Sequence, residues 1–452
     1  MRPFVTRPAF RLKGKIFPPG DKSIAHRYII IGALSRGLTR IKNFPANKDC
    51  FYTIQALRKL GIKITGYFDN AHKKNPTINV FAKGRFGLTK PGRPIFVGNS
   101  GTTLRLLLGV LAGQNFKVIL HAGESLSRRP MLRVTRPLRM MGAKIEARAV
   151  KNKKEGKSEE YLPITIKGNK LNSISYRMPV ASAQVKSALL LAALYAKGTT
   201  KVIEPVKTRD HTERILKLFK AGIKLKQNTI YIKGGKELIA PSRVVTVPGD
   251  ISSAAFFITL ASIIPDSQVL IRNVSLNPSR LGIIRVLKRM GADIQLSTNE
   301  SGRLTTEPMG NILARSSNLK GAIIRKKEIP SLIDELPVLM VAASLARGRT
   351  VFEGVGELRV KETDRIDSMM ENLKRMSANI GVFKEGKSEN IIIEGVKELR
   401  GARVRSFADH RTAMSMVVAG LAATGATKID DISCISKSYP EFINHLKILT
   451  NR

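Results

Sequence analysis

The tripeptide Pro-Gly-Asp occurs at 19–21 and again at 248–250, and each copy opens an apolar stretch with the pattern of a helix. Lys22 and Ser23 follow the first copy, whereas Ile251 and Ser252 follow the second. One half therefore carries a cation where the other carries an aliphatic side chain. The chain is predicted to be a duplicated scaffold whose chemistry is placed unequally between its halves.

Six apolar segments repeat one design, in which about a dozen residues of helical pattern reach a Gly or Pro and a short strand-like run follows. Their stop residues are 67 to 85 positions apart. Each segment is apolar nearly all round, which is typical of a helix buried on every side. The segments are 25–37, 103–113, 185–198, 253–265, 336–348 and 412–425.

A second signature alternates with the first: an amphipathic helix, then Gly, then a strand. It is clear at 57–64, 138–145 and 287–294, weaker at 218–225 and 373–380, and truncated at 442–449. The Gly suits the left-handed position that ends many helices. Helices that alternate with strands at this period favour an α/β fold of six βαβ-containing repeats.

Three repeats per half follow from the duplication. We expect one lobe over 21–240 and a second over 1–17 plus 248–452, with hinge crossings near 17–20 and 239–247. A strand is expected at 10–16, and 149–160, which is charged and poor in apolar residues, is expected to be an exposed loop.

The chain carries 78 Lys and Arg against 34 Asp and Glu, a net charge of +44. Clustered cations attract nucleic acid, but these are spread along the whole chain, and no aromatic-rich platform accompanies them. We therefore favour a basic bias of the surface and expect no specific nucleic-acid partner.

The longest apolar runs are too short to cross a bilayer, and the N-terminus lacks the apolar region of a signal peptide. The two cysteines, Cys50 and Cys434, have no CxxC partner, which fits a reducing compartment. We expect a soluble cytoplasmic monomer. No His pair has metal spacing and no covalent nucleophile motif appears, so we expect neither metal nor cofactor.

Several cations and small residues stand where helices are expected to start. Lys22, Ser23 and Arg27 fall at the first helix, and Gly101 lies in a small-residue run before the second, where backbone N–H groups can hold an anion. A capping role without a ligand explains such residues equally well. Further cations are Arg128, Arg129, Arg209, Lys361, Arg365, Arg411 and Lys437.

Two acids are candidates for proton transfer. Asp334 precedes an apolar helix, and Glu362 lies among cations. On spacing alone, Asp334 is as easily the capping residue of a helix with Pro337 in its first turn. Glu362 and Arg365 have the spacing of a structural ion pair.

Ten ordered motifs together resemble the 5-enolpyruvylshikimate-3-phosphate synthase family over essentially the whole chain. They are PPGDKSIAHR at 18–27, GNSGTTLRLL at 98–107, GESLSRRPM at 123–131, SAQVKSALLLA at 182–192, TRDHTERIL at 208–216, VPGDISSAAFF at 247–257, IPSLIDELPVL at 329–339, ELRVKETDRI at 357–366, DHRTAM at 409–414 and KSYP at 437–440. The resemblance implies a two-lobed inside-out α/β barrel, with three repeats and buried parallel helices in each lobe, and lobes that close on substrates.

The resemblance also implies the ligands of two small substrates. Shikimate 3-phosphate would be bound by Lys22, Ser23, Arg27, Ser182, Gln184, Arg209, Asp334 and Lys361. Phosphoenolpyruvate would be bound by Lys22, Gly101, Arg129, Arg365, Arg411 and Lys437. Two phosphates and two carboxylates sum to a charge of about −6, which a comparable number of cations can offset.

The implied reaction is addition–elimination, in which phosphoenolpyruvate is protonated, the 5-hydroxyl of the acceptor attacks, and phosphate leaves the tetrahedral intermediate. Asp334 would be the base near the hydroxyl, Lys22 and Glu362 would shuttle protons, and His410 would support Glu362. Because Gly101 has no methyl group, the resemblance predicts sensitivity to glyphosate.

Two other functions remain open from the sequence. A UDP-N-acetylglucosamine enolpyruvyltransferase shares the fold but carries Asn and a reactive Cys where this chain has Ser23 and Glu124. A nucleic-acid-binding protein on a related scaffold would need a contiguous basic face.

Overall fold

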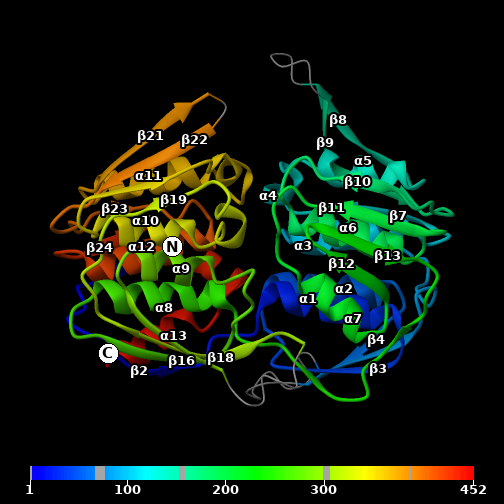
Figure 1. Ribbon diagram of the computed structural model, residues 1–452, viewed down its shortest axis with the longest axis horizontal. Coiled ribbons are helices and arrows are strands. Elements are labelled where there is room, and N and C mark those ends of the chain that lie inside the picture. Colours follow the sequence, from blue (N-terminus) through cyan, green and yellow to red (C-terminus); the bar gives the residue numbers. More distant parts are fainter. Residues whose placement is uncertain (1–2, 67–76, 152–157, 299–305, 387, 452) are drawn as a thin grey trace. The chain divides into compact units, whose positions relative to one another are not determined.

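The computed structural model describes residues 3–66, 77–151, 158–298, 306–386 and 388–451. Its contacts divide into two compact units, which Figure 1 shows by their colours. The N-half unit is Gly20–Val247, and the C-half unit is Met1–Pro19 together with Pro248–Arg452. The chain therefore changes unit immediately before Gly20 and immediately after Val247.

Within the described residues the strands form six sheets, three in each unit, and five of them share one strand order. Counted across each of these sheets, the first strand runs parallel to the second, the third is antiparallel to the second, and the fourth pairs antiparallel with the third at the edge. In the sheet β6–β7–β9–β8 these strands are Ile95–Phe96, Lys117–His121, Ser158–Lys167 and Lys144–Lys151. The predicted α/β fold of repeated βαβ-containing units is confirmed.

The other two sheets of the N-half unit follow this order. One is β14 (Leu238–Ile239), β3 (Ser35–Lys42), β5 (Ile78–Lys83) and β4 (Lys63–Thr65), with β15 (Val245–Thr246) also parallel to β3; the other is β10 (Ser175–Arg177), β11 (Thr199–Ile203), β13 (Thr229–Lys233) and β12 (Gly222–Lys226). Since β14 and β15 come last in this unit, the end of the unit's chain completes its first sheet.

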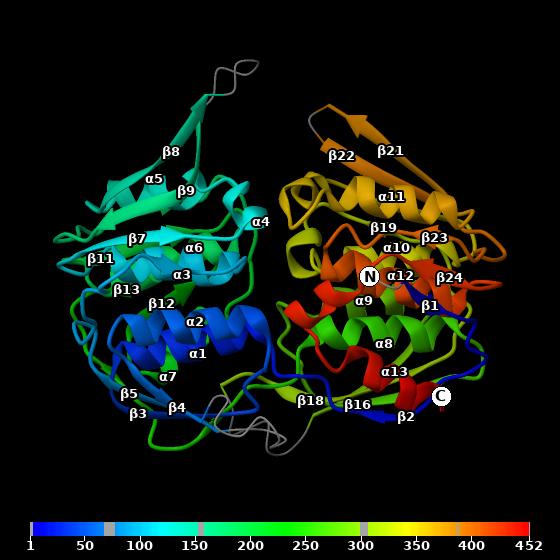
Figure 2. The ribbon, with the colours of Figure 1, turned by 180° about the vertical axis from the view of Figure 1, so that it is seen from behind.

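The C-half unit has two sheets of the same order and one smaller sheet. They are β2 (Lys13–Ile16), β16 (Gln268–Ser275), β18 (Met309–Arg315) and β17 (Asp293–Thr298); β19 (Ile323–Ile324), β20 (Arg349–Phe352), β22 (Ser388–Glu394) and β21 (Asn379–Glu385); and β1 (Phe4–Thr6), β24 (Thr427–Ile429) and β23 (Arg403–Val404). The N-terminal strand expected at 10–16 is shorter, and Figure 2 shows β2 beside β16 and β1 beside β24.

The six apolar segments form the buried helices that were predicted. They are α1 (Lys22–Ala33), α3 (Gly101–Leu111) and α6 (Ala183–Ala193) in the N-half unit, and α8 (Ile251–Ile263), α10 (Leu336–Ser344) and α12 (His410–Ala422) in the C-half unit. Every residue of α10 is buried, as is α8 up to Ser262. Each unit has its own apolar core, which these helices share with the inner faces of the sheets.

The amphipathic helices also lie where the Gly signature predicted them. They are α2 (Lys48–Lys59), α5 (Leu132–Met140), α7 (His211–Leu218), α9 (Gly282–Arg289), α11 (Arg365–Arg375) and α13 (Phe442–Thr450). Gly61, Gly142 and Gly291 adopt φ of 85°, 108° and 97°, the left-handed conformation that a Gly takes at low cost. In the weaker copy at 373–380, Ser377 holds this position with a φ of 67°. In the copy at 218–225 the helix ends earlier than the signature predicts, so that Lys220 adopts the left-handed conformation, with a φ of 65°, and Gly222 begins β12.

The loop expected at 149–160 is wrong at both ends. Ala149 pairs with Glu160, so the ends of β8 and β9 continue as a hairpin, and the middle, 152–157, lies outside the described residues. Composition misled here because Glu160 is charged but largely buried, and its carboxylate accepts a 2.8 Å hydrogen bond from Arg139. A paired acid can occupy a strand that its charge alone argues against.

In the part of the chain that the structure describes, no helix combines the length and the apolarity that crossing a membrane requires.

Candidate active site

Three buried helices of the N-half unit start with a capped first turn. The side chains of Asp21, Ser100 and Ser182 each accept a hydrogen bond from a backbone N–H of α1, α3 and α6 respectively. α3 and α6 begin next to each other, because Gln184 Nε2 donates to Thr102 Oγ1 over 2.9 Å. Adjacent helix N-termini favour bound anions through their N–H groups and dipoles.

Lys22 is the first residue of α1, and its ammonium is partnered by an acid. Lys22 Nζ lies 2.9 Å from Asp49 Oδ2, in the first turn of α2, and both side chains are less than one-fifth exposed. Because the ammonium is a compact charge on a flexible stem, it can bind an incoming anion while it keeps part of this contact.

Arg27 is buried and holds its neighbours in place. Its Nε donates to Thr212 Oγ1 (2.7 Å), Nη1 to the carbonyl oxygen of Ser23 (2.8 Å) and Nη2 to Ser187 Oγ (2.8 Å). Arg209 reaches the same place, with Nη1 3.5 Å from Ser23 Oγ. Predicted ligands on α1 and on the segment before α7 therefore meet around Ser23.

Gly101 is the first residue of α3 and lies near the guanidinium groups of Arg105 and Arg129. A methyl group at this position would lie 2.8 Å from Arg105 Nη1 and 3.3 Å from Arg129 Nη1. Arg105 Nη1 also donates to Gln184 Oε1 over 2.7 Å. The absence of a side chain at Gly101 thus leaves room beside two cations and a helix N-terminus.

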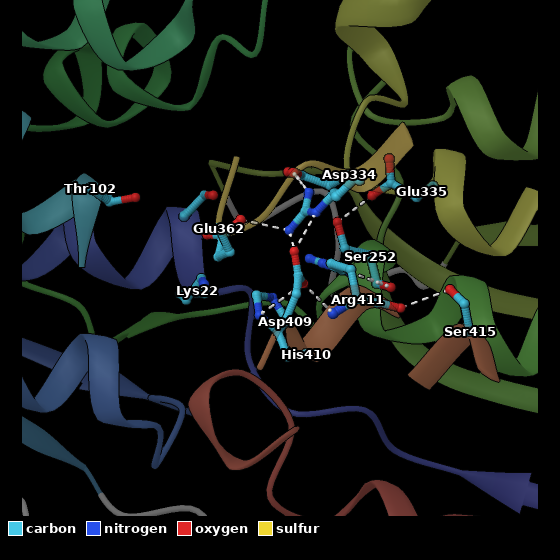
Figure 3. Close-up of polar contacts among 12 residues, drawn as sticks. Lys22, Thr102, Ser252, Asp334, Glu335, Glu362, Asp409, His410, Arg411 and Ser415 are labelled. Carbon is cyan, nitrogen blue, oxygen red and sulfur yellow. Dashed lines mark hydrogen bonds and ion pairs between the residues drawn. The ribbon is translucent and has the colours of Figure 1, made fainter. Parts of the chain in front are cut away.

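In the C-half unit, the buried Arg365 lies within 4 Å of three carboxylates, those of Asp334, Glu362 and Asp409, which Figure 3 labels. Its Nε lies 2.7 Å from Asp409 Oδ2, its Nη2 lies 2.7 Å from Glu362 Oε2, and its Nη1 lies 3.6 Å from Asp334 Oδ1. The predicted ion pair between Glu362 and Arg365 is confirmed. Burial opposes the charge of Arg365, but the acids, Asp409 first, outweigh it and raise the pKa of the guanidinium.

The three carboxylates differ in access. The side chain of Asp409 is fully buried, whereas Asp334 and Glu362 are each about one-quarter exposed. Asp409 also caps α12, since its Oδ1 accepts from the N–H of Arg411 over 2.7 Å. Asp334 and Glu362 are therefore the acids of this group that a ligand can reach.

The alternative that Asp334 caps the next helix is wrong. α10 begins at Leu336, and the residue at its cap is Glu335, whose side chain makes no capping hydrogen bond. Pro337 is the second residue of the helix, and residues 332–335 before the helix are in turn conformation. The carboxylate of Asp334 is directed at Arg365 instead of its own backbone.

The start of α8 connects the other two buried helices of this unit. Ser252 Oγ donates to Glu335 Oε1 and accepts a 2.5 Å hydrogen bond from Arg280 Nη2. The carbonyl oxygen of Ser252 accepts from Arg411 Nη1 over 3.1 Å. The N-termini of α8, α10 and α12 are thereby held together, as in the N-half unit.

The remaining predicted residues of the C-half unit are Lys361, His410 and Lys437, and their contacts differ. Lys437 Nζ donates to the carbonyl oxygen of Ala408 (3.1 Å), next to Asp409. His410 Nδ1 lies 3.8 Å from Asp409 Oδ1. Burial lowers the pKa of the Lys361 ammonium, and Asp334 is the main group that opposes this shift.

Among the described residues, no three His, Cys, Asp or Glu side chains come together in a way that could hold a metal ion. Both units carry cations and backbone N–H groups that can bind anions. A few partly exposed acids can transfer protons.

Five residues that hold the predicted site residues in place were not among those predicted from the sequence. Asp49 partners Lys22, Arg105 partners Gln184, Asp409 partners Arg365, and Ser252 and Arg280 join the buried helices. Asp409 offered a signal, because it stands before an apolar helix as Asp21 and Asp250 do. The others gave none, because their partners lie between 27 and 159 positions away.

Comparisons with known proteins agree over the length of the chain. A family model described as EPSP synthase (3-phosphoshikimate 1-carboxyvinyltransferase) matches residues 6–446. A 3-phosphoshikimate 1-carboxyvinyltransferase from Geobacter sp. (strain M21) is 45% identical over 454 residues, 100% of both chains. One from Thermoanaerobacter sp. (strain X514) is 46% identical over 97% of this chain and 98% of its own. A solved EPSP synthase from Acinetobacter baumannii is 39% identical, with a TM-score of 0.82 over 98% of this chain and 97% of its own.

Proposed function

The chain belongs to the EPSP synthase family, and from this premise we propose how its residues perform the family's reaction. The enzyme transfers the enolpyruvyl group of phosphoenolpyruvate to shikimate 3-phosphate and releases phosphate. The match to this family over 6–446 favours this enzyme over the UDP-N-acetylglucosamine enolpyruvyltransferase that the sequence left open.

We assign shikimate 3-phosphate mainly to the N-half unit. Ser23 and Arg209 lie 3.5 Å apart and supply a hydroxyl and a guanidinium for its phosphate, with Lys22 and Ser182 at neighbouring helix starts. Arg27 is assigned a supporting part in binding, because three of its nitrogens already hold Ser23, Ser187 and Thr212. Lys361 and Asp334 of the C-half unit complete this set.

We assign phosphoenolpyruvate to cations from both units. Arg129 and the open space at Gly101 come from the N-half unit, and Arg365, Arg411 and Lys437 come from the C-half unit. Guanidinium groups bind carboxylate and phosphate oxygens in pairs, so these positions suit an anion that carries both groups.

The proton transfers fall to Asp334, Glu362 and Lys22. Asp334 takes the proton of the 5-hydroxyl as that oxygen attacks C2 of phosphoenolpyruvate. Glu362 and Lys22 deliver the proton to the methylene carbon and withdraw one from the resulting methyl group as phosphate leaves. The observation that carries this assignment is the difference in access: Asp334 and Glu362 are partly exposed beside Arg365, whereas Asp409 is fully buried.

Replacement of Asp334 tests the assignment. Asp334→Ala is expected to lower kcat about 10²- to 10⁴-fold, because a general base is lost, and to change phosphoenolpyruvate binding much less. Phosphate release from shikimate 3-phosphate plus phosphoenolpyruvate gives kcat, and fluorescence titration gives the binding constant. Glu398→Ala, which removes an exposed acid, is the control. An Asp334→Ala enzyme with the turnover of the wild type would contradict the role.

A cytoplasmic location and a monomeric state are proposals of the same kind. A biosynthetic family and two cysteines that are buried and unpaired support a reducing compartment. Fractionation of cells and light scattering of the purified enzyme test the two proposals.

A further inference from the structure

The charge of the chain is concentrated in one of its two similar units. Residues 20–247 contain 44 Lys and Arg and 12 Asp and Glu, a net charge of +32, whereas the C-half unit contains 34 and 22, a net charge of +12. A bias in amino-acid usage would act on both units alike. The excess of cations is therefore a property of the N-half unit and not of amino-acid usage along the whole chain.

The sheets show where the difference arises. In the C-half unit, corresponding cross-strand rows pair a cation with an acid: Arg349 with Glu394 (2.5 Å) and Arg315 with Asp293 (3.0 Å). In the N-half unit the corresponding row of β7, β9 and β8 consists of lysines alone, Lys117, Lys167 and Lys144.

Like charges directly across a sheet destabilise it. All three of these lysines are exposed. Arg36 and Lys83 also face each other across β3 and β5 and are exposed, but Arg36 Nε lies 3.8 Å from Glu237 Oε1. The N-half unit thus keeps an unfavourable arrangement that its counterpart avoids, and a bound polyanion would relieve the repulsion.

The third sheet of the N-half unit carries cations around an aromatic ring. Lys201 of β11, Tyr231 of β13 and Lys224 of β12 lie in one row, and Lys201 Nζ is 5.9 Å from the centre of the Tyr231 ring. Val202, Ile230 and Ile232 alternate with them and are buried, so the row faces outward. This outward face, here called the basic sheet face, comprises Arg177, Lys201, Lys224, Lys226, Tyr231 and Lys233.

We propose that the basic sheet face binds single-stranded nucleic acid without regard to sequence. Its five cations are joined by no acid, so phosphates meet no repulsion there. Tyr231, on a central strand, offers a ring on which a base can stack. The face belongs to a four-stranded sheet and presents no helix that could enter the groove of a duplex, which favours a single strand.

The face is distinct from the residues assigned to the reaction. Those residues lie at the starts of helices and in the segments before them, whereas the basic sheet face lies on the strands β10–β13. Changes to it are therefore expected to leave phosphate release from the two substrates unchanged.

The experiment measures binding of a fluorescein-labelled 20-nucleotide oligouridylate by anisotropy over a series of salt concentrations. Lys201→Glu/Lys224→Glu/Lys233→Glu is expected to make the slope of log K against log salt shallower by about 2, because three phosphate contacts are lost. The matched control Lys13→Glu/Lys320→Glu/Lys428→Glu changes net charge equally but lies in the C-half unit, and its slope is expected to stay near that of the wild type. Equal losses in both triple variants would overturn the proposal in favour of net charge alone.

Tyr231→Leu tests the stacked base. It is expected to weaken oligouridylate binding about fivefold or more and to leave the binding of inorganic polyphosphate unchanged. Equal effects of this variant on both ligands, or none on either, would show that the ring recognises no base and would overturn the choice of nucleic acid. Phosphate release by every variant confirms that each is folded.

Discussion

Arg365 Nε lies 2.7 Å from Asp409 Oδ2, and this contact joins the first residue of α11 to the capping residue of α12. Neither side chain is exposed to solvent beyond 2%. The same carboxylate caps the helix that carries His410 and Arg411. One buried acid therefore sets the position of three of the residues assigned to the reaction.

Asp409→Asn isolates the charge of this acid, because Asn caps helices as well as Asp does. Removing one member of a buried ion pair is expected to lower the free energy of unfolding by about 3 kcal/mol, with Glu362 and Asp334 preventing a larger loss. Urea unfolding measures the change. Asp367→Asn, whose partner Arg359 is about one-third exposed, should cost less than about 1 kcal/mol. Equal losses in the two variants would contradict the prediction.

Arg280 offers a second buried charge, next to Glu335 and Asp250. Its Nη2 lies 3.5 Å from Glu335 Oε1 and 3.6 Å from Asp250 Oδ1. Arg280→Met is expected to lower the free energy of unfolding by about 3–5 kcal/mol, since it leaves buried acids uncompensated. Adding Glu335→Gln should recover more than about 1 kcal/mol in a double-mutant cycle. Strict additivity of the two changes would show that the residues do not act as a pair.

Gly101→Ala places a methyl group 2.8 Å from Arg105 Nη1, the end of a flexible side chain that can move. We expect the variant to fold, but its KM for phosphoenolpyruvate and its inhibition constant for glyphosate should rise about tenfold or more, since the added group crowds both guanidinium groups. The wild type is expected to be inhibited by glyphosate. Gly381→Ala, where a methyl group meets nothing within 4 Å, is the control. Unchanged constants in Gly101→Ala would mean that neither ligand uses this space.

The buried His26 is expected to lower the free energy of unfolding in acid. Burial lowers the pKa of His26 to about 3, with Asp49 opposing the shift, and its Nδ1 lies 2.7 Å from Thr53 Oγ1. Below pH 6.5 the unfolded chain binds a proton that the folded chain does not, so stability falls as the pH falls from about 6.5 towards 3. The loss approaches about 1.4 kcal/mol per pH unit. His26→Gln should remove this part of the slope in urea unfolding, and His121→Gln, at an exposed position, should not.

Lys361 is expected to cause a loss of activity at alkaline pH. Because the pKa of its ammonium is lowered by burial, the charge that we assign to the binding of shikimate 3-phosphate is lost at a lower pH than for an exposed lysine. The value of kcat/KM for shikimate 3-phosphate should therefore decline as the pH rises through this lowered pKa. Lys361→Arg, which keeps its charge, is expected to move the decline to higher pH. An identical alkaline limb in both enzymes would exclude Lys361 as its cause.

Local patterns predicted the helices of the fold, although they missed the hairpin ends at 149–151 and 158–160. The apolar segments at 25–37 and 336–348 became α1 and α10, and Gly61 and Gly142 ended their helices as expected. These features are set by neighbours within a few residues, through periodicity and the conformational freedom of Gly. The assignment of ligands came from motifs, and its division of roles stays a set of predictions.

The tertiary structure determined which polar and charged side chains contact each other. Arg365 and Asp409 are 44 positions apart, Ser252 and Glu335 are 83 apart, and Arg27 and Thr212 are 185 apart. No pattern along the chain couples such residues, because their contact depends on which helices pack together and in which register. For the same reason the lysines around Tyr231 are scattered along the sequence. They lie on one face of a sheet only because β11, β12 and β13 pair.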